Sequence, residues 1–196
     1  MARSVDLAAE WAAATAAVRQ RHLDPLRLRY GFPPTTILDR LGVARVRVEG
    51  DRYVPADDGV EAVVVAAFEG PPRLPDGRWR APNEIADLVV FRPVEPGRWW
   101  SRGGIVAALG EEMIGDFDDQ PVQVWRNPLA WLRSGATGVC LTTRDPIAAQ
   151  DVLVRLRTSP VVMDVEHGRE LDRIRGRCWT RFPPILVAEP ALAGAA

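Results

Sequence analysis

The sequence predicts an α+β fold: N-terminal helices with an antiparallel, hairpin-rich sheet, followed by a small C-terminal α/β unit of order βαβαβα. Two observations predict the antiparallel part. Apolar and polar side chains alternate on both sides of the turn Glu49-Gly50-Asp51, and two strand-like segments flank residues 93–97. A third observation predicts the α/β part: from residue 120 on, short apolar runs alternate with Asn127-Pro128 and Asp145-Pro146, pairs that typically begin helices.

These observations divide the chain into three parts. We expect residues 1–119 to form the helical and antiparallel module and residues 120–180 the α/β module. Residues 181–196, which are rich in Pro and Ala, are expected to form a loosely held tail.

The N-terminal module begins with a helix that is predicted from Ser4 to about His22, with Trp11 on its packed face. A short helix is expected within residues 35–41. Residues 61–68 contain three consecutive valines and predict a strand that is buried on both faces.

The second predicted hairpin joins a strand at Asp87–Phe91 to a strand at Arg98–Arg102. Residues 70–82 contain several prolines and indicate an irregular loop or a module boundary ahead of this hairpin. After it, a short helix is expected near residues 105–109.

Strands and helices alternate in the C-terminal module. The expected elements are strand 122–125, helix 129–133, strand 138–142, helix 146–156, strand 161–163 and helix 165–175. This order implies parallel strands joined by right-handed crossovers.

All 25 basic residues are arginines, since the chain contains no lysine, and they nearly balance the 26 acidic residues. Lysine-dependent chemistry is therefore excluded, including phosphate-binding loops with their lysine, Schiff-base enzymes and protein kinases. Two cysteines, Cys140 and Cys178, and two histidines, His22 and His167, offer no paired metal-ligand spacing, so a structural zinc site is not expected.

The chain offers no membrane-targeting signal. Its first ten residues lack the apolar segment of a secretory signal, and no apolar run reaches the roughly 20 residues of a membrane span. We expect a cytoplasmic protein without a membrane partner, of an oligomeric state that the sequence leaves open.

Candidate catalytic residues lie beyond the carboxyl ends of predicted parallel strands, where ligands gather in such sheets. Asp164, Glu166 and His167 follow one strand, and Asp145 follows another. Asp145, Asp164 and Glu166 could hold Mg²⁺ or Mn²⁺ through carboxylate oxygens, with His167 as a general base. The structural alternative is that Asp164 caps the next helix and Glu166 lies in its first turn.

A second acidic group comprises Glu111, Glu112, Asp116, Asp118 and Asp119. It could bind a cation, although it lacks the alternating ligands and the closing glutamate of a calcium loop. A solvated acidic turn is the interpretation that we expect.

Most of the seven tryptophans lie within two positions of an arginine, as in Arg98-Trp99-Trp100 and Trp125-Arg126. Aromatic rings next to guanidiniums can stack on bases and contact the phosphates of single-stranded nucleic acid. Arg98, Trp99, Trp100 and Arg126 are therefore the candidate nucleic-acid-binding residues. Two alternatives stay open: the tryptophans are core residues that shelter arginine stems, or Trp99 and Trp100 are exposed and anchor a protein partner.

Two segments resemble phage and plasmid primases. Residues 35–54 are similar to the helix and hairpin that precede the first zinc cysteines of these primases, and the element order of residues 122–175 is similar to a Toprim domain. In this comparison Asp164 and Glu166 match the paired acids of the later Toprim motif.

This chain departs from the primase pattern at three places. The zinc cysteines are absent, Arg126 stands roughly where the Toprim glutamate belongs, and Gly168 comes one residue early. The resemblance therefore implies a mobile-element protein that has lost both zinc and primer synthesis but still binds nucleic acid or a replication protein.

The leading hypothesis is a noncatalytic binding or regulatory protein of nucleic-acid metabolism, which needs no cofactor. Its expected partner is single-stranded nucleic acid or a replication protein. One alternative is a metal-dependent phosphoryl-transfer enzyme or nuclease that uses Mg²⁺ or Mn²⁺. Another is a protein–protein interaction module.

Overall fold

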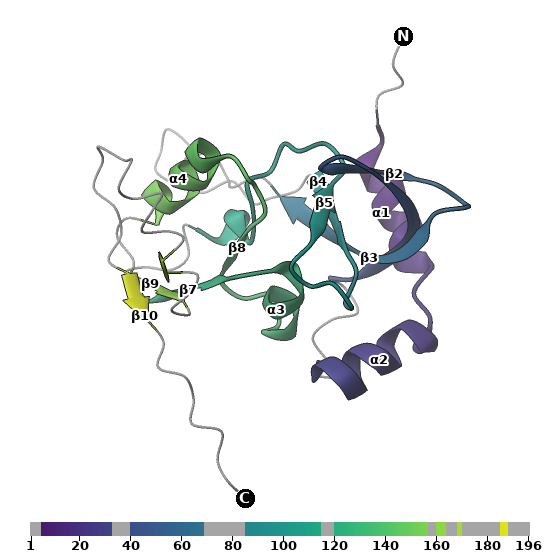
Figure 1. Ribbon diagram of the computed structural model, residues 1–196, viewed down its shortest axis with the longest axis horizontal. Coiled ribbons are helices and arrows are strands. Elements are labelled where there is room, and N and C mark those ends of the chain that lie inside the picture. The colour runs from purple at the N-terminus through teal and green to yellow at the C-terminus, as the bar shows by residue number, and fades with distance from the viewer. Residues whose placement is uncertain are drawn as a thin grey trace, which may run out of the picture.

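The protein has an α+β fold with two sheets, one of which closes into a five-stranded barrel (Figure 1). The computed structural model describes residues 5–32, 40–68, 85–114, 120–156, 160–163, 168–169 and 185–187. No helix in these ranges is long and apolar enough to cross a membrane.

The secondary-structure elements follow one another from helices to barrel to second sheet. The helices are α1 (Leu7–Ala16), α2 (Gln20–Tyr30), α3 (Pro128–Arg133) and α4 (Pro146–Arg155), with a 3₁₀ turn η1 at Glu111–Met113. The barrel strands are β1 (Gly42–Glu49), β2 (Arg52–Pro55), β3 (Val60–Phe68), β4 (Ile85–Phe91) and β5 (Trp99–Ser101). The second sheet contains β6 (Ala108–Leu109), β7 (Val122–Trp125), β8 (Val139–Leu141), β9 (Val161–Met163) and β10 (Ile185–Val187).

The expectation of one continuous N-terminal helix was wrong, because the chain breaks between α1 and α2. Arg19 is extended, with φ −134° and ψ 161°, and its guanidinium donates to the carbonyls of Ala16 and Val18. The imidazole of His22 accepts the Arg19 N–H at 3.0 Å, which starts a new helix. Asp6, rather than Ser4, caps α1.

Both predicted hairpins are present, and with β3 they build the barrel in the order β1-β2-β5-β4-β3. Neighbouring strands are antiparallel except at the seam, where β2 and β5 run parallel through the single pair Arg52 and Ser101. β3 and β4 are buried on both faces, as expected for β3. Val64 and Val90 pack in the cluster that includes α1, whereas Val65 and Phe91 pack in the cluster that includes α3 and β8.

The segment that joins β2 to β3 passes directly over the backbone of β1. β2 pairs with residues 46–49 of β1, and β3 pairs with residues 42–46. At the crossing, a Cβ on Gly59 would lie only 2.4 Å from the carbonyl oxygen of Val46. The barrel therefore requires glycine at position 59.

The second sheet has the order β10-β9-β7-β8-β6, and all its pairs are parallel except β6 with β8. The predicted helix starts are confirmed. The side chain of Asn127 accepts the Ala130 N–H at the start of α3, and that of Asp145 accepts the Ile147 N–H at the start of α4.

Two parts of the second sheet differ from the sequence-based prediction. Residues 105–109 do not form a helix, because the Ala107 carbonyl accepts the N–H groups of Thr142 and Thr143 and draws the segment alongside β8 as β6. Ile185–Val187, in the segment expected to be a loose tail, forms β10 beside β9.

Several predicted segments lie outside the described residues. These are nearly all of the helix within 35–41, the loop 70–82, and the helix 165–175 apart from residues 168–169.

We predict that Gly59→Ala destabilises the barrel by about 3 kcal/mol or more, because backbone atoms of β1 cannot move away from the new methyl group. Gly97→Ala is the matched control. Nothing lies within 4 Å of a Cβ at position 97, so we expect a change within about 0.5 kcal/mol. Urea denaturation of both variants measures the difference, and equal effects would contradict the proposed steric constraint.

Candidate functional site

The predicted catalytic residues are only partly within the described chain. Asp164, Glu166 and His167 lie outside it. The carboxylate of Asp145 accepts the Ile147 N–H at 2.9 Å, and so it caps α4. Within the described ranges, no group of three or more His, Cys, Asp and Glu side chains is placed to hold a metal ion.

Trp99 and Trp100 are half-buried and contribute to packing. The indole N–H of Trp99 donates to the carbonyl of Thr142 at 2.8 Å, which links β5 to the end of β8. Trp100 packs against the core cluster that includes α1. Both residues therefore contribute to packing, as in the alternative in which the tryptophans are core residues. Arg126 is exposed at the carboxyl end of β7.

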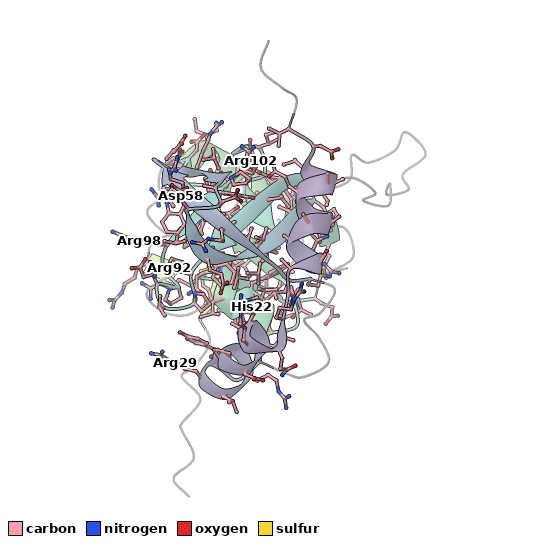
Figure 2. The ribbon with its side chains drawn as sticks, turned by 90° about the vertical axis from the view of Figure 1, so that its right-hand side faces the viewer. His22, Arg29, Asp58, Arg92, Arg98 and Arg102 are labelled. Carbon is pink, nitrogen blue, oxygen red and sulfur yellow. The ribbon has the colours of Figure 1, made fainter. Side chains whose placement is uncertain are left out.

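Three arginine side chains project from the same side of the molecule (Figure 2). We call Arg29, at the end of α2, and Arg92 and Arg98, in and beside the β4–β5 turn, the arginine edge. Arg29 and Arg98 are exposed and form no ion pair with other described residues. Arg29 lies 5.7 Å from the ring centre of Tyr30, and Arg92 pairs with Glu95 at 3.6 Å.

The buried carboxylate of Asp87, in β4, holds the loop that follows β5. It is fully buried and accepts the N–H groups of Leu88, Gly103 and Ile105 at 2.7–2.9 Å. Three such bonds satisfy a buried charge that would otherwise be costly. The sequence contained no local signal for this role, because Asp87 and its partners Gly103 and Ile105 are brought together only by the hairpin.

Arg102, in the same loop, connects the barrel to α1. Its guanidinium forms a two-pronged ion pair with Glu10, with hydrogen bonds of 3.0–3.2 Å. The hydrogen bond to Glu10 raises the pKa of Arg102. Both side chains are mostly buried, so the pair is worth more than an ordinary surface salt bridge.

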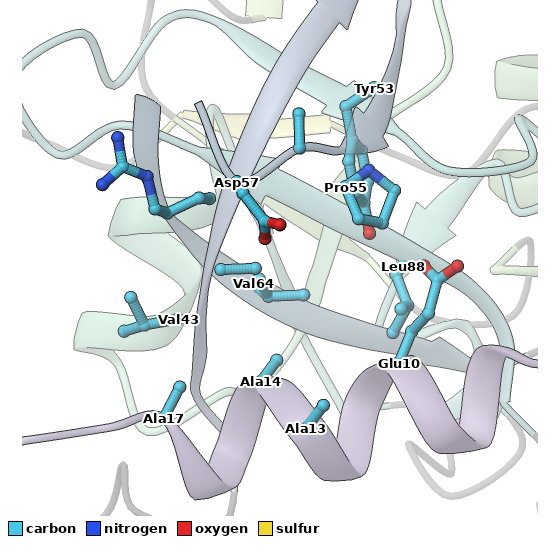
Figure 3. Close-up of a pocket in the computed structure, with 13 residues that line it drawn as sticks. Glu10, Ala13, Ala14, Ala17, Val43, Tyr53, Pro55, Asp57, Val64 and Leu88 are labelled. Atoms are coloured by element: carbon cyan, nitrogen blue, oxygen red, sulfur yellow. The ribbon is translucent and has the colours of Figure 1, made fainter. Parts of the chain in front are cut away.

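A groove of about 410 Å³ lies between α1 and the barrel strands β1 and β2 (Figure 3). Ala13, Ala14 and Ala17 of α1 form one wall, and Val64 and Leu88 contribute to the apolar lining. The small alanine side chains allow α1 to approach β1 closely at Ala14 while leaving space beside Ala13 and Ala17.

The polar side chains of Glu10, Tyr53 and Asp57 line the groove (Figure 3), together with the charged side chain of Arg45. Tyr53 is only 2% exposed, and burial raises the pKa of its hydroxyl, helped by the neighbouring charge of Glu10. The hydroxyl is therefore neutral at physiological pH. Sequence reasoning missed these residues, and the only available signal was the run of alanines in the first helix.

Part of the second acidic group is buried rather than solvated. Glu111 and Glu112 expose only 8% of their side chains; Glu111 pairs with Arg155, and Glu112 with Arg40 at 3.6 Å. The solvated-turn interpretation was therefore wrong for these two residues, which the 3₁₀ turn η1 directs into the structure. The remaining acids of the group lie outside the described residues.

Comparisons with known proteins found no match: no protein-family model, no curated protein and no solved structure matches the chain.

We predict that Glu112→Gln stabilises the protein at neutral pH. Burial, opposed in part by Arg40, raises the pKa of Glu112 above its unfolded-state value, so the folded state holds this proton more tightly. Stability from this group is therefore present below the unfolded-state pKa and is lost as pH rises through the folded-state pKa.

The measurement is urea denaturation of the native protein and the variant at about pH 4 and pH 7. The gain from Glu112→Gln should be present at pH 7 and shrink at pH 4. Glu49→Gln, at an exposed position, serves as the control and should show no such difference. A Glu112→Gln variant that is less stable than the native protein at pH 7 would contradict the expectation.

Proposed function

We propose that the protein is a noncatalytic binding protein of nucleic-acid metabolism, which contacts the phosphates of single-stranded nucleic acid through the arginine edge. The observation that carries this proposal is the common direction of Arg29, Arg92 and Arg98, which come from two segments far apart in the sequence, the end of α2 and the β4–β5 turn (Figure 2). Two of the three have no acidic partner among the described residues.

Guanidinium groups suit this role because their planar fork of donors matches the oxygens of a phosphate. The near-neutral total charge of the chain does not prevent such binding, since the contact depends on local charge within about one Debye length of roughly 10 Å. A local arginine edge is therefore sufficient for salt-sensitive binding.

Apolar side chains accompany the arginines. Leu28, beside Arg29, is 87% exposed, and Val94, in the turn between Arg92 and Arg98, is 58% exposed. Exposed apolar surface next to phosphate-binding groups can contact unstacked bases, which single strands present and duplexes do not. These residues support a single strand as the partner.

The alternatives have less support from the described residues. The metal-dependent enzyme would use Asp164 and Glu166, which lie outside the described residues, and Asp145, its third candidate ligand, is engaged as a helix cap. The protein-interaction module needs Trp99 and Trp100 as exposed anchors, whereas both are half-buried. The resemblance to primases is in keeping with a nucleic-acid partner and remains a prediction.

The test is fluorescence anisotropy of a labelled oligothymidine of about 20 nucleotides, titrated with the protein at several salt concentrations. We expect affinity to fall as salt rises. The triple variant Arg29→Ala/Arg92→Ala/Arg98→Ala should bind at least about tenfold more weakly, and the slope of log K against log salt should become shallower by about 2, which is roughly 0.7 for each lost phosphate contact.

Arg47→Ala is the control, because it removes an exposed arginine that is already paired with Asp58 at 2.8 Å. The change in log K that Arg47→Ala causes should be much smaller than one-third of the change that the triple variant causes. No binding at about 50 mM salt, or an unchanged salt slope in the triple variant, would contradict the proposed function.

A further inference from the structure

The start of α2 is held by a histidine side chain rather than by an ordinary helix cap. The N-cap residue is Arg19, whose guanidinium has no acceptor and cannot bond to the free N–H groups of the first turn. Instead, the Arg19 N–H donates to Nδ1 of the His22 ring at 3.0 Å, and the His22 N–H donates to the Arg19 carbonyl at 2.9 Å. The bond to the imidazole therefore fixes the place at which α2 begins.

Pro25 makes the first turn of α2 more dependent on this bond. A proline inside a helix lacks the N–H that would donate to the carbonyl four residues earlier, here that of Arg21. The second half of the helix is anchored by Leu26, which is 2% exposed and packs in the core cluster that includes α3 and β8. The first turn, residues 20–24, is thus the part of α2 that a change at His22 can release.

The His22 ring can hold the start of α2 only while it is neutral. Both ring nitrogens face N–H donors at 3.0 Å: Nδ1 faces the backbone of Arg19, and Nε2 faces Nε of Arg21. A neutral imidazole accepts through one nitrogen, and an imidazolium accepts through neither, because both of its nitrogens carry a proton. The Arg21 side chain is 76% exposed and can bond to water instead, so the backbone bond determines that Nδ1 is the acceptor. Protonation of the ring breaks this bond.

The charged groups around the ring act in opposite directions on its protonation. Arg19 and Arg21 flank it on the chain, and the positive end of the helix dipole lies at the same place, so all three disfavour a charged ring. Glu61 of β3 favours it: its carboxylate lies 3.4 Å from Nε2 and also pairs with Arg21 at 3.6 Å. On β1, Arg45 lies opposite Glu61 and donates to a backbone carbonyl. A charged ring, placed between α2 and the barrel (Figure 2), therefore keeps its carboxylate partner and loses its bond to the helix start.

We propose that His22 is a pH-sensitive switch at the joint between α1 and α2. While the ring is neutral, Nδ1 accepts the Arg19 N–H and the first turn of α2 is helical. When the ring takes up a proton, this bond is lost, the ring pairs with Glu61, and residues 20–24 leave the helical conformation. Histidine is the side chain that ordinarily changes its charge between about pH 5 and pH 8, so the switch acts within this range.

The experiment follows the full-length protein by NMR from about pH 8 to about pH 5. The ring signals of His22, identified by their absence from the variant His22→Gln, report its protonation, and Cα chemical shifts report the helical state of α2. We expect residues 20–24 to lose at least about half of their helical shift as the ring becomes protonated, since loss of a helix cap changes the local equilibrium about fivefold. Residues 26–30 should keep theirs, because Leu26 is buried in the core.

Three variants test the assigned role. In His22→Gln the side-chain oxygen accepts the same N–H without titrating, as glutamine does in an ordinary capping box, so the first turn should stay helical at both ends of the pH range. His22→Ala removes the acceptor and should show the open first turn even at about pH 8. In Glu61→Gln, acidification should still open the turn, because the ring, and not the carboxylate of Glu61, takes up the proton.

The proposal would be overturned by any of four results: a first turn that stays helical while the ring is protonated, a His22→Gln variant that opens on acidification as the native protein does, a His22→Ala variant that is as helical as the native protein at about pH 8, or a Glu61→Gln variant that no longer responds to pH. None of these measurements involves the arginine edge or a nucleic acid, so the switch stands or falls independently of the proposed function.

Discussion

The buried carboxylate of Asp87 is the interaction on which the arrangement of the N-terminal half depends. It accepts three backbone N–H groups, two of them from the loop that follows β5, and it is fully buried in the strand β4. The chain leaves the β4–β5 ladder after the bond from the Arg102 N–H to the Leu88 carbonyl and turns through Gly104 at φ +70°, so the N–H groups of Gly103 and Ile105 bond to Asp87 in place of a neighbouring strand. A single acidic side chain thus guides the path of residues 103–105.

Two features of the molecule follow from this path. The first is the barrel seam, where β2 and β5 are joined by one residue pair and need the loop to hold β5 in place. The second is the position of α1. The side chain of Arg102 extends from the loop to Glu10 of α1, and this ion pair holds the helix against the barrel. The groove exists because α1 is held at this distance and faces the space with three small alanine side chains beside that of Glu10.

The sequence predicted the elements whose signals are local. Alternation and turn residues identified both hairpins, and the pairs Asn127-Pro128 and Asp145-Pro146 identified the starts of α3 and α4. Features that depend on contacts between distant residues were missed or wrong. Residues 105–109 read as a short helix because their composition permits one, and only the carbonyl of Ala107, which bonds to the end of β8, shows why they form β6 instead.

At the candidate site, too, local sequence signals were informative and contacts between distant residues were not foreseen. The Arg-Trp pattern drew attention to Arg98, which is exposed just before β5, but pattern alone could not show that Trp99 and Trp100 are packed by the core or that Arg29 would lie on the same side. The groove residues Tyr53 and Asp57 carried no sequence signal, because their chemistry arises from the space beside α1.

Hydrogen exchange of backbone amides in the variant Asp87→Asn tests the central claim, that this carboxylate positions both the loop and α1. The account predicts that protection falls at Gly103, Ile105 and along α1 together, while the amides of α4, which pack in the second sheet, keep their native protection. Loss of protection at Gly103 and Ile105 with α1 unchanged would contradict the account, because the helix would then be held in place independently of Asp87.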